Sequence, residues 1–161
     1  MADNRIRINT KGIEHLGKVL GERYSIKVGI MGTKARQEHN GTTLTNAEIG
    51  TIHEFGSAKR EIPRRSFLRE PLIERLANYL VSKKAFSKQA VDEAVKEGTL
   101  LELAKKVGVV AEEVIQEAFA TRGFGKWKAN KPSTIARKGS DSPLIDTGQL
   151  RRSITSKVDK R

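Results

Sequence analysis

The clearest strand signal in the sequence is the stretch YSIKVGIMG, residues 24–32. Its apolar side chains occupy every second position, at Tyr24, Ile26, Val28 and Ile30. Because successive side chains of a strand point to opposite faces, this alternation predicts a half-buried strand with one apolar face. The sequence on either side of it supplies helices that could cover that face.

Four segments around the strand carry apolar residues at helical spacing. They are residues 10–23, a segment that begins at Thr43 or Thr45 and runs to Phe55, residues 69–84, and residues 87–121. In the third of these, Pro71 is tolerable only within the first turn. In the last, Gly98 and Gly108 are candidate breaks, because glycine weakens a helix interior.

The helical pattern disappears between residues 121 and 143, in the stretch TRGFGKWKANKPSTIARKGSDSP. A connection of about 20 residues without secondary structure is uncommon in a compact domain and is usually functional or disordered. Beyond it, Asp146 with Gln149 three residues later resembles a capping box, which predicts a short helix. A strand through Ile154, Ser156 and Val158 is expected to follow.

These elements predict an α+β fold in a single domain, residues 1–161. We expect a small mixed or antiparallel β-sheet of three to five strands, packed against two long α-helices at about 69–84 and 87–121. A flexible basic loop, residues 122–143, completes this arrangement.

Composition narrows the class of protein. The chain has 161 residues, 37% of them hydrophobic, and no cysteine, which excludes disulfides and thiolate chemistry. No apolar run approaches the ~20 residues of a membrane span, and residues 1–15 lack the apolar core of a secretion signal, so we expect folding in a cytosol. The net charge of +12 favours polyanions or acidic proteins as partners, and it concentrates in residues 1–86 and 119–161, which flank an acidic middle.

Signals for enzymatic chemistry are weak. His53-Glu54 begins like a zinc-protease helix, but Ser57 stands where the second histidine belongs. Gly29-Ile30-Met31-Gly32 lacks the Gly-Lys-Ser/Thr continuation of a phosphate loop, and there is no Gly-x-Ser-x-Gly elbow. We therefore expect no enzyme, and we assign no catalytic, cofactor-binding or metal-ligating residue.

Residues 100–117 imitate a helix-turn-helix, with small Ala104, a turn at Gly108 and apolar Val114 at suitable positions. The candidate recognition helix, residues 110–117, holds three glutamates and no lysine or arginine. Such a charge would repel phosphates. We therefore favour a helix packed on a sheet, with an acidic face in solvent.

The loop 122–143 interleaves basic residues with aromatic and apolar ones. The basic residues are Arg122, Lys126, Lys128, Lys131, Arg137 and Lys138, and the others are Phe124, Trp127 and Ile135. This mixture could bind single-stranded nucleic acid, could dock on an acidic partner protein through aromatic anchors, or could be a solvated loop. We favour the docking of a partner during assembly.

Three segments resemble one family, the virion morphogenesis or tail completion proteins of long-tailed bacteriophages. They are AEIGTIHEFG (residues 47–56), IPRRSFLR (residues 62–69), and NKPSTIARKG with PLIDTGQLRRSI (residues 130–139 and 143–154). The strand at residues 26–32 also matches, so the resemblance covers about residues 24–158. Within this pattern we expect Phe55 to plug the sheet and Asp146 to cap the short helix.

The resemblance implies a structural protein of the phage neck or tail that completes the tail and joins it to the filled head. It implies a ring-forming subunit, with a hexamer expected from the six-fold tail. The implied partners are further copies of the chain, the neighbouring tail terminator, tail tube or head-completion proteins, and passing genomic DNA, with no membrane. The implied location is the host cytoplasm during assembly and then the virion. The alternative is a nucleic-acid-binding protein that uses its basic patches.

We expect thirteen residues to contact neighbouring subunits or partner proteins, because they combine positive charge with aromatic anchors. They are Arg64, Arg65, Phe67, Arg69, Phe124, Lys126, Trp127, Lys128, Lys131, Arg137, Lys138, Arg151 and Arg152.

Overall fold

The computed structural model describes residues 10–161; residues 1–9, part of the segment used to argue against a secretion signal, lie outside the described residues. Within that range the chain is α+β, as predicted, with eight helices and one two-stranded sheet. In chain order the elements are α1 Thr10–Leu20, β1 Tyr24–Ile30, α2 Gly32–Arg36, α3 Asn46–Phe55, α4 Arg69–Ser82, α5 Lys88–Glu97, α6 Leu101–Ala120, α7 Pro132–Lys138, α8 Gln149–Arg152 and β2 Ile154–Lys160.

The sheet pairs β1 with β2 in antiparallel register, from Tyr24 opposite Lys160 to Ile30 opposite Ile154. The predicted alternation of β1 is confirmed: Ile26, Val28 and Ile30 share one face, while Lys27 is exposed on the other. The expected sheet of three to five strands is wrong, since the described residues hold only these two strands and two isolated bridges. Residues 62–68 do not add a strand. The backbone N–H groups of Phe67 and Leu68 donate to the Glu54 side chain instead.

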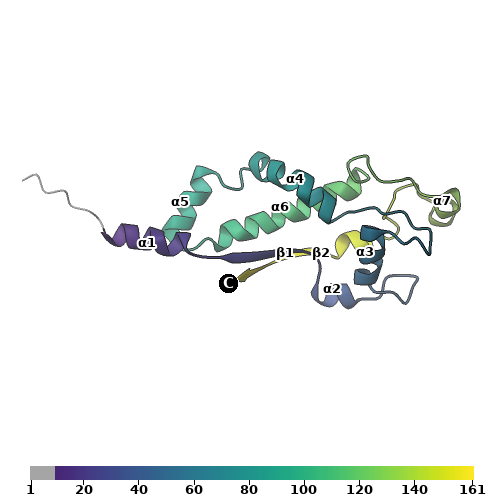
Figure 1. Ribbon diagram of the computed structural model, residues 1–161, viewed down its shortest axis with the longest axis horizontal. Coiled ribbons are helices and arrows are strands. Elements are labelled where there is room, and N and C mark those ends of the chain that lie inside the picture. Colours follow the sequence, from purple (N-terminus) through teal and green to yellow (C-terminus); the bar gives the residue numbers. More distant parts are fainter. Residues whose placement is uncertain (1–9) are drawn as a thin grey trace, which may run out of the picture.

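Helix α6 lies between the sheet and α4, and both make extensive contacts with it (Figure 1). It is continuous from Leu101 to Ala120, so no turn forms at Gly108 and the helix-turn-helix geometry is absent from residues 100–117. Gly108 instead permits close packing on β2. A Cβ at this position would lie 2.8 Å from the Ser156 hydroxyl oxygen.

The predicted helix over residues 87–121 is two helices, α5 and α6, that meet at an angle (Figure 1). Gly98 ends α5 in the left-handed conformation, with φ of 74°, which glycine adopts without strain. A carboxylate from a distant segment binds the residues just before α6. The Leu100 N–H and the Thr99 hydroxyl each donate to Glu22 at 2.8 Å.

The other helices confirm some predictions and correct others. Thr45 caps α3 through a capping box with Glu48, Gly56 follows the last residue, and Pro71 lies in the first turn of α4. Asp146 does not cap α8, because the N-cap is Gly148, which has no side chain. Helix α2 was not predicted, and α7 occupies part of the segment 122–143 that was expected to lack secondary structure.

The molecule is elongated, with α1 and α5 at one end of its long axis and α7 at the other (Figure 1). The hydrophobic core comprises Phe67, Ile115, Phe119, Leu150 and Ile154. Along the described chain, no helix combines the length and the apolar composition that a membrane span requires.

Candidate functional site

A buried carboxylate joins two of the motif segments. Glu54, the penultimate residue of α3, is only 5% exposed and accepts four hydrogen bonds from residues 66–69. The donors are the Ser66 hydroxyl at 2.5 Å and the backbone N–H groups of Phe67 at 2.9 Å, Leu68 at 3.0 Å and Arg69 at 3.1 Å. The N-cap residue of α4, Leu68, has no capping side chain. Glu54 therefore supplies the negative charge that the N-terminus of α4 favours.

Arg65 and Ser66 bind the chain at residues 127–129, directly before the third motif segment. The Arg65 guanidinium donates to the carbonyl oxygens of Lys128 and Ala129, at 2.7 and 2.9 Å. The Trp127 indole N–H donates to the carbonyl oxygen of Ser66 at 3.0 Å. We call the set Glu54, Arg65, Ser66, Phe67 and Trp127 the Glu54 junction.

Aromatic packing covers the inner side of this junction. Phe67 is fully buried, and its ring centroid lies 5.3 Å from that of Phe119. Trp127 meets Phe119 edge-on, with the ring centroids 5.8 Å apart. Tilted and edge-to-face contacts of this kind add stabilisation beyond the area they bury. Polar bonds and aromatic packing thus hold three segments, separated by tens of residues in the sequence, as one unit.

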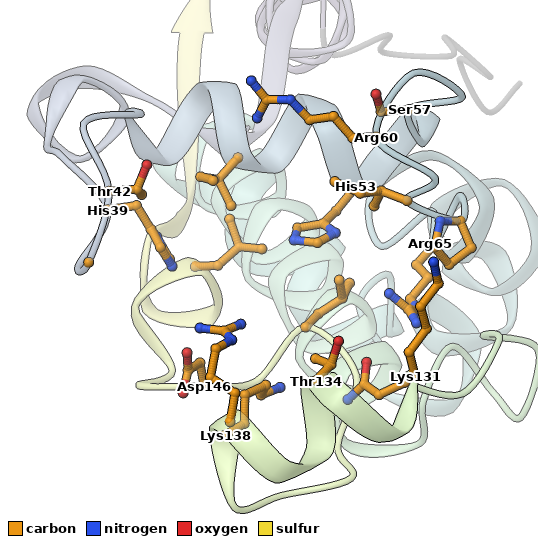
Figure 2. A pocket seen from close by; sticks show the side chains of 18 of the residues that line it. His39, Thr42, His53, Ser57, Arg60, Arg65, Lys131, Thr134, Lys138 and Asp146 are labelled. Atoms are coloured by element: carbon orange, nitrogen blue, oxygen red, sulfur yellow. The ribbon is translucent and has the colours of Figure 1, made fainter.

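Beside the junction lies a pocket with a cavity volume of about 610 Å³. Its walls come from α3, from residues 57–65, from α7 with the residues before it, and from residues 144–150. Figure 2 shows His53 pointing into the pocket from α3, with Thr134 and Lys138 of α7 on the opposite wall. Six Lys or Arg residues line it against only two acidic residues, Glu61 and Asp146. The basic residues are Arg60, Arg65, Lys128, Lys131, Arg137 and Lys138.

Burial, together with the positive charge of the pocket, lowers the pKa values of two groups inside it. Burial, helped by the nearby Arg65, His39 and Lys138, lowers the pKa of His53 from 6.5 to about 4. Burial also lowers the pKa of Lys138, and the charges of Arg137 and Arg65 act in the same direction, while Asp146 opposes them. In addition, the His53 Nδ1 atom is buried and has no hydrogen-bond partner. The pocket therefore carries unbalanced positive charge.

Several of the expected contact residues lie inside the chain. Phe67 is 0% and Arg65 only 6% exposed, so both side chains are buried in this chain, although Arg65 also lines the pocket. Trp127 is half-buried in the aromatic cluster, and Arg151 is half-buried and bonded to Gln116. Phe124 is half-buried beneath the Arg75 guanidinium, 4.9 Å from its ring centroid. Phe55 departs from expectation in the opposite way, because it is 62% exposed instead of plugging the sheet.

The remaining expected contact residues lie on the surface or line the pocket. Arg64, Lys126 and Lys131 form ion pairs with Glu70, Glu74 and Glu61, respectively. Arg152 donates to the Thr147 carbonyl oxygen and Lys138 to that of Ser142. The Arg69 side chain is exposed, although its backbone N–H donates to Glu54. Lys128 and Arg137 are exposed and, between Thr10 and Arg161, make no ion pair or side-chain hydrogen bond.

Sequence reasoning missed Glu54 and the role of His53 in the pocket. The signal that could have found Glu54 is its spacing: it follows Asn46 and Gly50 at intervals of four, and these three residues are the buried face of α3. The apolar residues Ile52 and Phe55 indicated a different face of α3 as the buried one. A carboxylate aligned with a glycine on a short helix suggests an acceptor for backbone N–H groups of a packed neighbour.

The surplus of Lys and Arg side chains in the pocket suits the binding of anions. In the described residues no group of three or more His, Asp or Glu side chains could hold a metal ion. The histidines of this part of the chain are not hydrogen-bonded to a hydroxyl or a carboxylate: His15 contacts the Val95 carbonyl oxygen and His39 the Asn46 amide. Comparison of the chain with protein-family models, curated proteins and solved structures found no match in any of the three.

Proposed function

We propose that this chain is a structural protein of the neck or tail of a long-tailed bacteriophage. In this role it completes the tail and takes part in head–tail joining as a ring-forming subunit, with a hexamer as the expected copy number. The proposal rests on the resemblance of residues 47–56, 62–69, 130–139 and 143–154 to tail completion proteins.

The observation that carries the proposal is the meeting of the first two motif segments at the Glu54 junction, which also holds the chain directly before the third. Glu54 of the first segment accepts from Ser66 and the backbone of the second. Arg65 of the second holds the chain at Ala129, directly before the third. Segments that resembled a family only by chance would not be expected to contact one another in the fold. Their mutual contacts support the view that they define one structural unit.

The electrostatics of the chain support a role in assembly. The motif residues build a rigid support, and next to it the α7 end presents Lys128 and Arg137 without acidic partners in the described chain. Exposed cations beside a concave surface are typical of a face that contacts an acidic partner. These features are expected of a subunit that assembles with other proteins.

The test uses the phage whose genome encodes this chain. A nonsense mutation in its gene should yield filled heads and separate tails, and a plasmid copy of the gene should restore joined particles. Mass spectrometry and imaging should then find the chain at the head–tail junction of mature particles. Joined, infectious particles that lack the chain would contradict the proposal.

A nucleic-acid-binding function is the second candidate, favoured by the unpaired cations Arg60, Lys128 and Arg137. Its discriminating measurement is the affinity of the chain for duplex DNA across a salt series. Multiple phosphate contacts predict a steep, linear fall of the logarithm of the affinity with the logarithm of the salt concentration. Weak binding at every salt concentration would leave assembly as the better explanation.

A further inference from the structure

The lining of the pocket beside the Glu54 junction holds two kinds of side chain, and both constrain what it can bind. Cationic side chains include Arg137 and Lys138 on α7 and Lys128 nearby. Apolar side chains include Ile49, Ile62 and Leu150. A ligand that satisfies both must carry a negative charge close to an apolar group.

The imidazole of His53 is the second observation that points to a ligand. Figure 2 shows this ring directed into the pocket, and its Nδ1 atom has no hydrogen-bond partner among the described residues. Burial and nearby positive charge both disfavour protonation of the ring. A carboxylate in the pocket would offset the surrounding charge and stabilise the protonated ring.

The same walls favour a peptide over a nucleic acid. Proteins that bind single strands stack the bases on aromatic side chains, and no Phe, Tyr or Trp lines this pocket. A duplex presents its phosphates on a convex surface, whereas this site is a cavity of about 610 Å³. That volume falls within the range of roughly 300–1,000 Å³ that encloses a ligand of drug size, which is comparable with a few residues of extended peptide.

The charge of the whole chain favours a different protein over a second copy. At a net charge of +12, a second copy is attracted to this basic pocket less strongly than an acidic protein is, whereas contacts at other surfaces would join copies in a ring. Of the three acidic side chains of α5, Asp92 is paired with Lys88 and Glu93 is bonded to Gln89, which leaves Glu97 without either contact in the described chain. A separate acidic protein would instead be attracted to the α7 end.

We propose that this pocket binds a short acidic peptide segment of a neighbouring virion protein, with a carboxylate near His53 and Arg137 and an apolar side chain against Ile49 and Ile62. The identity of the partner as a virion protein rests on the proposed function; the chemistry of the site does not. Lys128 and Arg137 strengthen the attraction from the rim of the pocket.

The test measures fluorescence anisotropy of a short fluorescein-labelled peptide in which glutamates alternate with leucines, titrated with the full chain at low salt. Three probes serve as controls: the same peptide with glutamines for glutamates, the same peptide with serines for leucines, and labelled single-stranded oligothymidylate. We expect the first peptide to bind and the three controls to bind at least about tenfold more weakly.

The matched variants reverse two charges at opposite ends of the molecule. Lys128→Glu with Arg137→Glu alters the pocket, and Lys11→Glu with Lys18→Glu makes the same change in net charge on α1. All four side chains are exposed and form no ion pair within the described chain, so both variants should fold. The pocket variant should lose about tenfold or more in affinity, and the α1 variant about threefold or less.

A second measurement reports on the pocket directly. Saturating peptide should shift the imidazole resonances of His53 and raise its pKa from about 4, because a carboxylate stabilises the protonated ring. An absence of peptide binding, equal losses in the two variants, or a His53 signal that does not respond would overturn the inference. Tighter binding of oligothymidylate that depends on Lys128 and Arg137 would replace the peptide with a nucleic acid.

Failure of the inference and failure of the proposed function give different results. If the peptide does not bind but mature particles contain the chain at the junction, only the inference fails. If the peptide binds at the pocket but the chain is absent from particles, the proposed function fails and the acidic-peptide site stands.

Discussion

The two ends of the molecule are stabilised in different ways. At the α7 end, Glu54, Arg65 and Trp127 bond segments that are far apart in the sequence. At the other end, α1 buries Val19 but leaves Ile13 62% and Leu20 65% exposed. The α7 end is joined by buried polar groups, whereas the polar contacts at the α1 end, from His15 and Glu22 to residues 95–100, are exposed or half-buried. The same substitution should therefore have very different effects at the two ends.

The largest effect is expected from Glu54→Gln. The amide keeps one oxygen acceptor but places an NH₂ group among donors, which leaves some N–H groups of residues 67–69 buried and unpaired. Hydrogen bonds to a charged acceptor contribute about 1.5–3 kcal/mol each. We expect the free energy of unfolding, measured by urea denaturation, to fall by about 4 kcal/mol.

Glu14→Gln is the matched control for this prediction. It makes the same chemical change on exposed α1, where Glu14 has no ion pair or side-chain hydrogen bond in the described chain. Its effect should stay within about 0.5 kcal/mol. Equal stabilities of the two variants would remove the distinction between the ends.

The next largest effect is expected at Trp127. Trp127→Ala removes the edge-on contact with Phe119 and the hydrogen bond to Ser66, and should lower the free energy of unfolding by about 3 kcal/mol. Trp127→Phe keeps an aromatic ring but not the N–H donor, and should cost about 1 kcal/mol. Circular dichroism during urea unfolding measures both. A smaller loss for alanine than for phenylalanine would show that the packing of Trp127 is not important.

Trp127 also provides an optical probe of the junction. It is the only tryptophan of the sequence. Its fluorescence in the unaltered chain should change in the main unfolding transition, together with the circular dichroism signal. A separate, earlier change in fluorescence would mean that the segment around Trp127 detaches before the core unfolds.

A pH-dependent effect of intermediate size should come from His53. Its pKa is lowered to about 4 in the folded chain, chiefly by burial, so between pH 6.5 and pH 4 the unfolded chain binds more protons. The contribution of neutral His53 to the free energy of unfolding is then fully present above pH 6.5 and decreases as the pH falls. Urea denaturation should show a loss of up to about 2 kcal/mol between about pH 7 and pH 5.

The cause of that loss can be separated from the titration of carboxylates. Glu22, Glu48 and Glu61 have lowered pKa values, each chiefly because of a hydrogen bond, so their contributions are lost only below the ordinary carboxyl range near 4.5. His53→Gln should flatten the dependence above about pH 5. An unchanged slope in that variant would assign the loss to another group.

Much of the fold was predictable because it depends on local patterns. Alternation identified β1, the helical spacing of apolar residues identified α4, and a threonine cap at Thr43 or Thr45 placed the start of α3. The number of strands was not predictable. The extended segment near Phe67 has the appearance of a strand, but its N–H groups donate to a side chain, Glu54, from another element.

The candidate site was less predictable than the fold, for a related reason. Positive charge and aromatic residues in residues 122–138 suggested a surface, yet Trp127 turns inward and Lys126 is paired with Glu74. Whether a cation remains free depends on carboxylates brought close only by folding. Five of the six basic residues that line the pocket were among the expected contact residues, but the pocket that gathers them depends on the fold.

The smallest effect is expected on the exposed face of α1. Ile13→Gln and Leu20→Gln replace side chains that are already mostly in water, so each should change the free energy of unfolding by about 0.5 kcal/mol or less. Val19→Ala, on the same helix, removes two methyl groups from a site with 0% exposure and should cost about 2 kcal/mol. Urea denaturation of the three variants would show how much of the attachment of α1 comes from Val19. If Leu20→Gln proved as costly as Val19→Ala, a further surface would have to cover this face, and the contrast between the two ends would no longer hold.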